Sequence, residues 1–240
     1  MKQFARYTFG IRSLALTFLC LLAWTRPASS QGVTWQALPF PVDTDWHGPI
    51  GQPSTITSNQ VVLQGQPVRS LQTYSGPLTL SCTASLSNDV TSQGGFWLSL
   101  IPLGQALNSN LTSGILFSIS YGNSYGNQIQ LYSYLPGGQS TELWSNSFPI
   151  AVGANYQLNM GVAANGVLSL NVNGQSYPLP NSTTLPFSQF QIQMQGWSPP
   201  ETWTASNFAV VPEPATAVLV AVSLAGFATL LRRRKQITNS

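Results

Sequence analysis

The sequence predicts an all-β protein: an antiparallel β-sandwich of the jelly-roll kind, preceded by a signal peptide and followed by a transmembrane helix. Three observations lead to this prediction. Between residues 60 and 211, apolar and polar residues alternate in many short segments, as in strands that bury one face. Gly and Asn separate these segments at near-regular intervals, which is typical of turns between antiparallel strands. The same region contains no amphipathic helical pattern.

The clearest strand is predicted at Leu78–Ser85, where apolar side chains point one way and hydroxyl side chains the other. Residues 31–59 are rich in Pro, Gly and Trp and are interpreted as loops with one terminal strand. Asn173-Gly174 predicts a two-residue hairpin turn of the primed type. Further strands of alternating pattern are predicted at 96–100, 115–121, 128–134, 156–162, 168–172 and 190–194.

The order of elements from Tyr156 to Tyr177 is a strand, Asn165-Gly166, a second strand and Asn173-Gly174. It resembles the corresponding hairpins of concanavalin A-like (laminin-G-like) jelly rolls. The resemblance is one of pattern, without a diagnostic motif. It implies a lectin-like sandwich, and a sandwich of different topology is the alternative.

The C-terminal segment combines a short motif, an apolar run and a basic end. The apolar run, Ala215–Leu231, has 17 residues and would span about 26 Å as a helix, close to the thickness of a bilayer core. Clustered cations beside a span stay on the cytoplasmic side, so the sequence predicts a domain outside and residues 236–240 inside. The motif is Pro212, Glu213 and Pro214, and the basic stop is Arg232, Arg233, Arg234 and Lys235.

This tripartite order, with Ser206–Val211 as its lead-in, resembles the PEP-CTERM sorting signal of exosortase-dependent bacterial proteins. The resemblance implies export, recognition of residues 212–235 by a membrane-embedded exosortase-like enzyme, and display on the cell envelope or release from it. A lipid-anchor signal of the eukaryotic type is the weaker alternative, because such tails normally end without a basic cluster.

The N-terminal segment has the form of a secretory signal peptide. Residues 1–24 contain a positive leader and an apolar core of 11 residues, too short for a permanent span. Small residues at Ala28 and Ser30 suit signal peptidase, so the mature chain is predicted to start at Gln31. The exported domain is then predicted at residues 31–211.

Charge excludes one class of partner for this domain. Residues 31–211 hold one cation, Arg69, against five acids. Nucleic-acid binding requires clustered cations on the fold itself, so it is excluded. A surface made of amides and hydroxyls suits extracellular polysaccharide. Cys82 is the one cysteine of this region, so no intrachain disulfide is expected there, and it is predicted to be a buried small hydrophobe.

Asp43 and Asp45, next to His47, form the one cluster of ionisable residues in the predicted domain. Their carboxylates could be oxygen ligands of Ca²⁺. The alternative is a solvated loop in which each Asp bonds nearby backbone amides. Zinc is excluded because the domain offers no Cys/His set. No cofactor is expected, with Ca²⁺ as the one open alternative.

Catalysis is not predicted. Glycoside hydrolysis needs two carboxylates close together, and Glu142 and Glu201 are isolated in the sequence. The Glu-x-Asp-x-x-Glu strand that laminarinase-like jelly rolls carry is absent, as is a Gly-x-Ser-x-Gly elbow. The aromatic residues are the remaining candidates, since exposed rings beside amides can bind sugars. Glycan contacts are predicted at Tyr121, Tyr125, Trp144 and Trp197, with packing in the core as the alternative for each ring.

Together these features predict an exported envelope or extracellular-matrix protein with a non-catalytic structural or adhesive role. The alternative is a carbohydrate-binding, lectin-like module that could depend on Ca²⁺. A glycoside hydrolase is the third reading.

Overall fold

The computed structural model describes residues 32–38, 53–88, 93–105, 113–122, 126–134, 140–180, 183–197 and 201–213. All of these residues except Glu213 belong to one compact unit, Ser30–Pro212. The predicted signal peptide with its cleavage site, and the sorting signal from Pro214 through its span and basic stop, lie outside the described residues. Within the described residues, no helix has the length and apolar character needed to cross a membrane.

The described residues form β-strands only, arranged in two sheets, and every strand pairing is antiparallel. The predicted all-β sandwich is therefore confirmed. The strands are β1 (Trp35–Ala37), β2 (Thr55–Ile56), β3 (Gln60–Leu63), β4 (Val68–Ser70), β5 (Tyr74–Ser75), β6 (Leu78–Asn88), β7 (Gln93–Pro102), β8 (Gly114–Gly122), β9 (Gln128–Tyr134), β10 (Ser140–Ser147), β11 (Asn155–Val162), β12 (Leu168–Val172), β13 (Gln175–Tyr177), β14 (Gln189–Trp197) and β15 (Thr202–Pro212).

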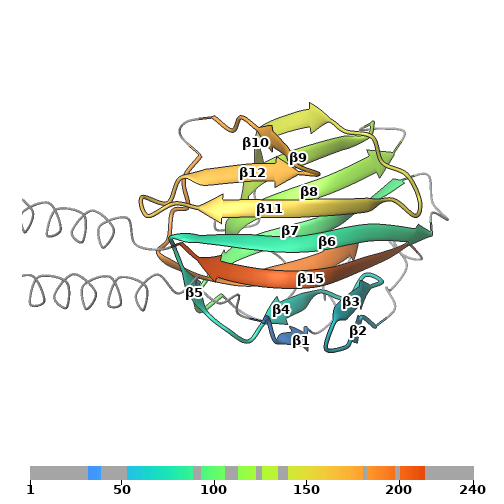
Figure 1. The fold of residues 1–240 in the computed structure, drawn as a ribbon, viewed down its shortest axis with the longest axis horizontal. Coiled ribbons are helices and arrows are strands. Elements are labelled where there is room, and N and C mark those ends of the chain that lie inside the picture. The colour runs from blue at the N-terminus through green and yellow to red at the C-terminus, as the bar shows by residue number, and fades with distance from the viewer. Residues whose placement is uncertain are drawn as a thin grey trace, which may run out of the picture. The chain divides into compact units, whose positions relative to one another are not determined.

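The two sheets lie face to face (Figure 1). The eight-stranded sheet has the order β1-β4-β14-β7-β8-β9-β10, with β5 pairing to β14. The seven-stranded sheet, in front in Figure 1, has the order β13-β12-β11-β6-β15-β3-β2. Neighbours such as β14 and β7 are far apart in the sequence, so most of the architecture depends on long-range pairing.

The core lies between the sheets and is made of alternate residues of each strand. On β6 the predicted inward set, from Leu78 to Ala84, is buried, and so is the set on β7. Burial of each large apolar side chain contributes about 1.5–3 kcal/mol. Cys82 is a free, buried thiol as predicted, and burial raises its pKa to about 12. Alternation in the sequence therefore identifies the inner faces correctly.

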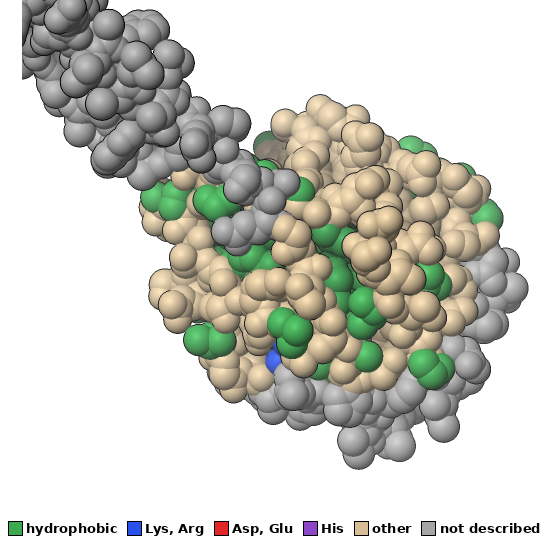
Figure 2. Space-filling model, turned by 60° about the horizontal axis from the view of Figure 1, so that its bottom comes forward, with side chains coloured by type: hydrophobic (Ala, Val, Ile, Leu, Met, Phe, Trp, Pro, Cys, Tyr) green, Lys and Arg blue, Asp and Glu red, His purple; other side chains and the backbone are tan. Residues whose placement is uncertain are grey.

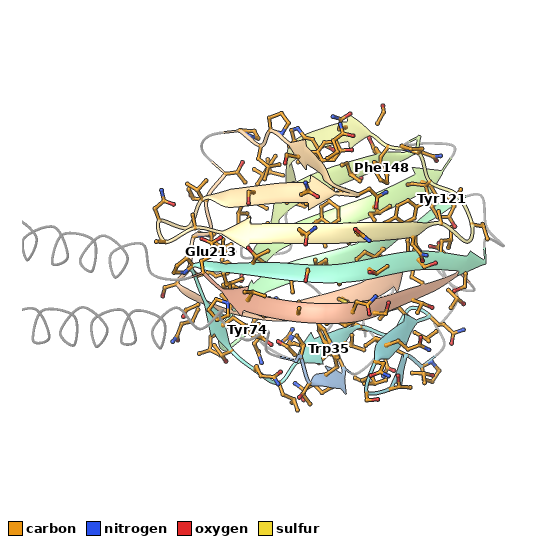
Figure 3. All side chains as sticks on the ribbon, viewed as in Figure 1. Trp35, Tyr74, Tyr121, Phe148 and Glu213 are labelled. Carbon is orange, nitrogen blue, oxygen red and sulfur yellow. The ribbon has the colours of Figure 1, made fainter. Side chains whose placement is uncertain are left out.

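Aromatic side chains join the two sheets near one end of the sandwich. Trp203 on β15 is fully buried, and its ring lies 5.8 Å from that of Phe96 and 6.2 Å from that of Tyr156. Phe148 continues the cluster, 5.5 Å from Tyr156. Figure 3 shows Phe148 at the same end as Tyr121. These centroid distances are typical of stabilising aromatic pairs.

The predicted hairpin turn at Asn173-Gly174 is confirmed. Val172 pairs with Gln175 across it, and Asn173 and Gly174 have φ angles of 53° and 80°. Positive φ at both central positions defines the primed turn, and Asn-Gly adopts it at low cost. The Asn171 side chain accepts a hydrogen bond from Gly174 N at 3.0 Å.

Strand β15 was not predicted from the sequence. Ser206–Val211, taken as the lead-in of a sorting motif, is part of this strand, which lies between β6 and β3 and ends where Pro212 pairs with Leu78. A bulge with Asn207 at φ 53° shifts the register between Ser206 and Ala209. The one extra residue breaks the period-two pattern, which hides the strand in the sequence.

Candidate functional site

The outer face of the eight-stranded sheet, directed away from the core, is unusual because it is polar and largely buried. Arg69 is 1% exposed and Gln193 is 2% exposed. Buried polar side chains are more informative than exposed ones, because the cost of removing each from water must be offset by hydrogen bonds. We define the outer face by Arg69, Trp97, Ser99, Ile101, Leu116, Ser118, Ser120, Gln130, Tyr132, Gln191, Gln193 and Gln195.

Strand register aligns these residues in rows across the sheet. Residues directly opposite each other in paired strands lie on the same face, about 5 Å apart. One row runs through Arg69, Gln193, Ser99, Leu116, Tyr132 and Glu142. The next row runs through Gln195, Trp97, Ser118, Gln130 and Ser145.

A small apolar cluster interrupts the polar rows. Ile101 and Leu116 are buried there, and Trp97, Tyr132 and Tyr134 pack against them while remaining half-buried. Burial raises the pKa of Tyr134 above its ordinary value. The cluster provides aromatic rings beside fixed polar groups.

Arg69 is held by acceptors on two other segments. Its Nε and Nη2 donate to Gln193 Oε1 at 3.2 Å and 2.9 Å, and its Nη1 donates to the carbonyl of Gln105 at 3.0 Å. Burial lowers the pKa of Arg69 from its ordinary value, but a guanidinium stays protonated in proteins. The side chain therefore connects β4, β14 and the segment after β7.

Glutamines 191 and 195 are also fixed by backbone contacts. Gln191 Nε2 donates to the carbonyl of Ser70 at 2.9 Å. Gln195 Nε2 donates to the carbonyl of Gly65 at 3.2 Å. With Gln193 they occupy alternate positions of β14, so three amides of defined orientation follow one another along one strand.

A second polar cluster lies at the β9–β10 edge of the same sheet. The exposed carboxylate of Glu142 accepts hydrogen bonds from Gln130 Nε2 at 3.0 Å, Tyr132 Oη at 3.3 Å and Ser145 Oγ at 2.7 Å. Gln130 Nε2 also donates to the Tyr132 hydroxyl. Glu142, isolated in the sequence, is therefore part of a network that borders the outer face.

The structure places two of the predicted glycan-contact residues in the sandwich interior. Tyr121, near the end of β8, is 6% exposed and belongs to the core. Trp144 is half-buried against the core, 5.5 Å from Tyr177 in an edge-on arrangement. A register shift between Glu142 and Trp144 turns that ring inward. Tyr125, the side chain of Trp197, Asp43 and Asp45 lie outside what the structure describes.

The residues of the outer face were missed by the sequence prediction. The alternation predicted at 96–100 and 190–194 is confirmed: Trp97 points opposite to Phe96, and the glutamines of β14 alternate with apolar residues. Nothing in this local pattern distinguishes a covered polar face from one that is open to solvent.

Glu201 is a buried carboxylate with a packing role. It is 2% exposed and accepts a hydrogen bond from Trp203 Nε1. Its Oε2 lies so close to β7 that a Cβ on Gly94 would be 1.4 Å from it. Glycine at position 94 is therefore required for Glu201 to occupy this position.

Charged groups are scarce in the part of the chain that the structure describes, where Arg69, Glu142, Glu201 and Glu213 are the charged side chains. In Figure 2 no acidic side chain of a described residue is visible, and the coloured surface is mostly backbone and uncharged polar groups. Among these residues no group of three His, Cys, Asp or Glu could hold a metal ion. The predicted calcium ligands Asp43 and Asp45 are not among them.

The sequence matches no protein-family model and no curated protein. Its structure is similar to carbohydrate binding module CBM66 from Bacillus subtilis, with a TM-score of 0.52 and 14% identity over 77% of this chain and 99% of that one. The potassium-bound Emp46p carbohydrate recognition domain gives a TM-score of 0.55 and 13% identity, over 76% and 100%. Bacillus licheniformis beta-glucanase gives 0.51 and 12%, over 78% and 94%. These similarities confirm the predicted concanavalin A-like β-sandwich.

Proposed function

We propose that this chain is a carbohydrate-binding protein whose ligand lies on the half-buried part of the outer face, at Trp97, Tyr132, Gln191 and Gln195. The observation that carries the proposal is the placement of half-buried Trp97 and Tyr132 among amides held in fixed orientations. The proposal is supported by two structural neighbours named as a carbohydrate binding module and a carbohydrate recognition domain. This function corresponds to the lectin-like alternative of the sequence analysis.

The chemistry of the face suits a sugar. A pyranose ring has an apolar C–H surface, which packs on the π-face of an indole or phenol, and a rim of hydroxyls that both donate and accept hydrogen bonds. Trp97 would provide the packing surface. Gln191 and Gln195 would form hydrogen bonds to the hydroxyls. Because backbone contacts already hold these side chains, binding would cost little further side-chain entropy.

We propose binding without hydrolysis. The glucanase neighbour raises the alternative of catalysis, but glycoside hydrolysis needs two carboxylates about 5–10 Å apart that flank the bond. Of the described acids, Glu142 is exposed at the β10 edge and Glu201 is buried against Gly94. The strand β14 presents amides on this face, which cannot act as general acids or bases.

We further propose that the domain acts outside the cell, displayed on the envelope or released into the matrix. The support comes from the sequence features at residues 1–30 and 212–235. An exported glycan-binding domain would attach the cell surface to extracellular polysaccharide, which combines the adhesive and lectin-like readings.

A glycan array with the purified full-length chain tests this function. The assay is run in Ca²⁺ and again with a chelator. Specific binding to a set of glycans is expected, and its absence from every glycan would overturn the proposal in favour of a structural role. Loss of binding on chelation would assign a ligand-binding role to a calcium site, for which Asp43 and Asp45 are the candidates.

A further inference from the structure

The hydrogen bonds behind the outer face determine what each glutamine can offer to a ligand. An amide nitrogen can only donate and an amide oxygen can only accept. A glutamine whose nitrogen faces a carbonyl, or whose oxygen faces a guanidinium, therefore has one defined orientation. The other terminal atom of the amide is then the one that this hydrogen bond leaves unused.

Gln191 and Gln195 present acceptors. Each uses Nε2 to donate to a backbone carbonyl, that of Ser70 and Gly65 respectively. Among the described residues, neither Oε1 has a hydrogen-bond partner. Both side chains are half-buried rather than fully covered. Their carbonyl oxygens are therefore the amide atoms that no described residue uses.

Gln193, between them on β14, has the opposite orientation. Its Oε1 accepts two N–H groups of Arg69, which leaves Nε2 as the remaining polar atom. Along the strand the order is acceptor, donor, acceptor, with residues two apart separated by about 6.6–6.8 Å. The hydroxyls of a sugar match this order, because each hydroxyl can both donate and accept a hydrogen bond.

The opposite side of the face adds acceptors. Gln130, which is buried, uses Nε2 to donate to Tyr132 and Glu142, so its Oε1 is the amide atom that these bonds leave unused. The Glu142 carboxylate contributes negative charge at the rim. Acceptors therefore predominate on both sides of Trp97.

Among the described residues of this face, no cation is available to pair with an anionic ligand. Arg69 is the one Lys or Arg in the part of the chain that the structure describes. Its Nε, Nη1 and Nη2 already donate to Gln193 and Gln105, and it is buried. A carboxylate or sulfate brought to this face would lose water without gaining a donor of opposite charge, which is strongly unfavourable.

We propose that the ligand is a neutral glycan whose hydroxyls donate to Gln191 and Gln195, and that acidic glycans are rejected. This inference depends on the proposed function and specifies its ligand class. The selectivity has two causes: the amides around Trp97 present mainly acceptors, and the donors of Arg69 already bond Gln193 and Gln105.

The test compares three forms of one polysaccharide with the same backbone. These are the neutral polymer, its derivative with C6 oxidised to a carboxylate, and the methyl ester of that derivative, which is neutral again. Affinity electrophoresis of the full-length chain is performed through gels containing each form. The neutral polymer is expected to bind at least tenfold more tightly than the carboxylated one, and esterification is expected to restore most of the affinity.

Equal or tighter binding of the carboxylated polymer would overturn this inference while leaving carbohydrate binding intact. Binding of none of the three forms, for every backbone on the glycan array, would overturn both. The variant Gln195→Met is expected to lose about tenfold in affinity for the neutral polymer. Gln157→Met, an exposed glutamine on the other sheet, is the matched control and is expected to bind like the wild type. Unchanged binding by Gln195→Met would contradict the role given to that acceptor.

Discussion

Arg69 donates two hydrogen bonds to a single atom, Gln193 Oε1, at 3.2 Å and 2.9 Å. The two residues pair across β4 and β14 although they are 124 positions apart in the chain. A charged donor shared in this way fixes the amide and compensates a buried cation. The pair therefore stabilises the middle of the outer face and determines what that face can bind.

Replacing Arg69 by Met should lower the free energy of unfolding by about 3 kcal/mol, because Gln193 Oε1 and the Gln105 carbonyl lose buried donors. Urea denaturation measures this loss. The double variant Arg69→Met/Gln193→Met should recover part of it, since replacing both partners by apolar groups removes the orphaned acceptor. A loss below about 0.5 kcal/mol in the single variant would show that these bonds contribute little.

Gly94→Ala should destabilise the protein by about 2–3 kcal/mol, because the added methyl would lie 1.4 Å from Glu201 Oε2 and the buried carboxylate would have to move. Thermal unfolding is the measurement. Gly32→Ala is the matched control, since a Cβ there meets nothing within 4 Å, and it should change stability by less than about 0.5 kcal/mol. Similar midpoints for the two variants would mean that Glu201 is not held as described.

Tyr74→Phe should keep or raise stability, by up to about 1 kcal/mol. The Tyr74 hydroxyl is buried without a hydrogen-bond partner in the part of the chain that is described, and burial raises its pKa to about 12. Removing a buried, unsatisfied hydroxyl eliminates a desolvation penalty. A loss of more than about 1 kcal/mol in urea denaturation would indicate that the hydroxyl makes a stabilising bond.

Cys82 should make stability fall at alkaline pH. Its pKa is raised by burial from 9.0 to about 12, so between these values the unfolded chain releases the thiol proton and the folded chain keeps it. The free energy of unfolding should therefore decrease from about pH 9 upwards, by up to about 1.4 kcal/mol per pH unit for this group. Cys82→Ala should show a shallower decrease in urea denaturation across this range. An unchanged slope would exclude Cys82 as its source.

The sequence predicted the fold where apolar residues alternate with polar ones and the apolar set faces the core. Strands β6, β7 and β8 each bury every second residue in the core, so their positions could be recognised. Strand β15 could not be recognised, because its bulge at Asn207 inserts one extra residue into the alternating pattern. Strand β10 was missed because only Leu143 and Trp144 in it are half-buried and the others are exposed. Its register also shifts between Glu142 and Trp144.

The candidate site was harder to predict than the fold for a different reason. Gln191, Gln193 and Gln195 look like ordinary solvent-facing residues of an alternating strand. Their role depends on Arg69, Ser70 and Gly65, which pairing across the sheet brings beside them. Likewise, Tyr121 and Trp144 have the residue type of glycan contacts but face inward. Composition shows which residue types could bind a glycan, whereas long-range strand register decides which of them lie on the same face.

The most direct test of the account is the affinity of Trp97→Ala for whichever neutral glycan the wild-type chain binds, measured by isothermal titration calorimetry. Trp144→Ala is the matched control, because it removes the same side chain from the same sheet on the opposite face. Both variants are first checked for a folded state by circular dichroism. The account predicts at least a tenfold loss for Trp97→Ala, about 1.4 kcal/mol or more, and near wild-type affinity for Trp144→Ala. Full affinity in a folded Trp97→Ala variant would contradict the placement of the site on this face.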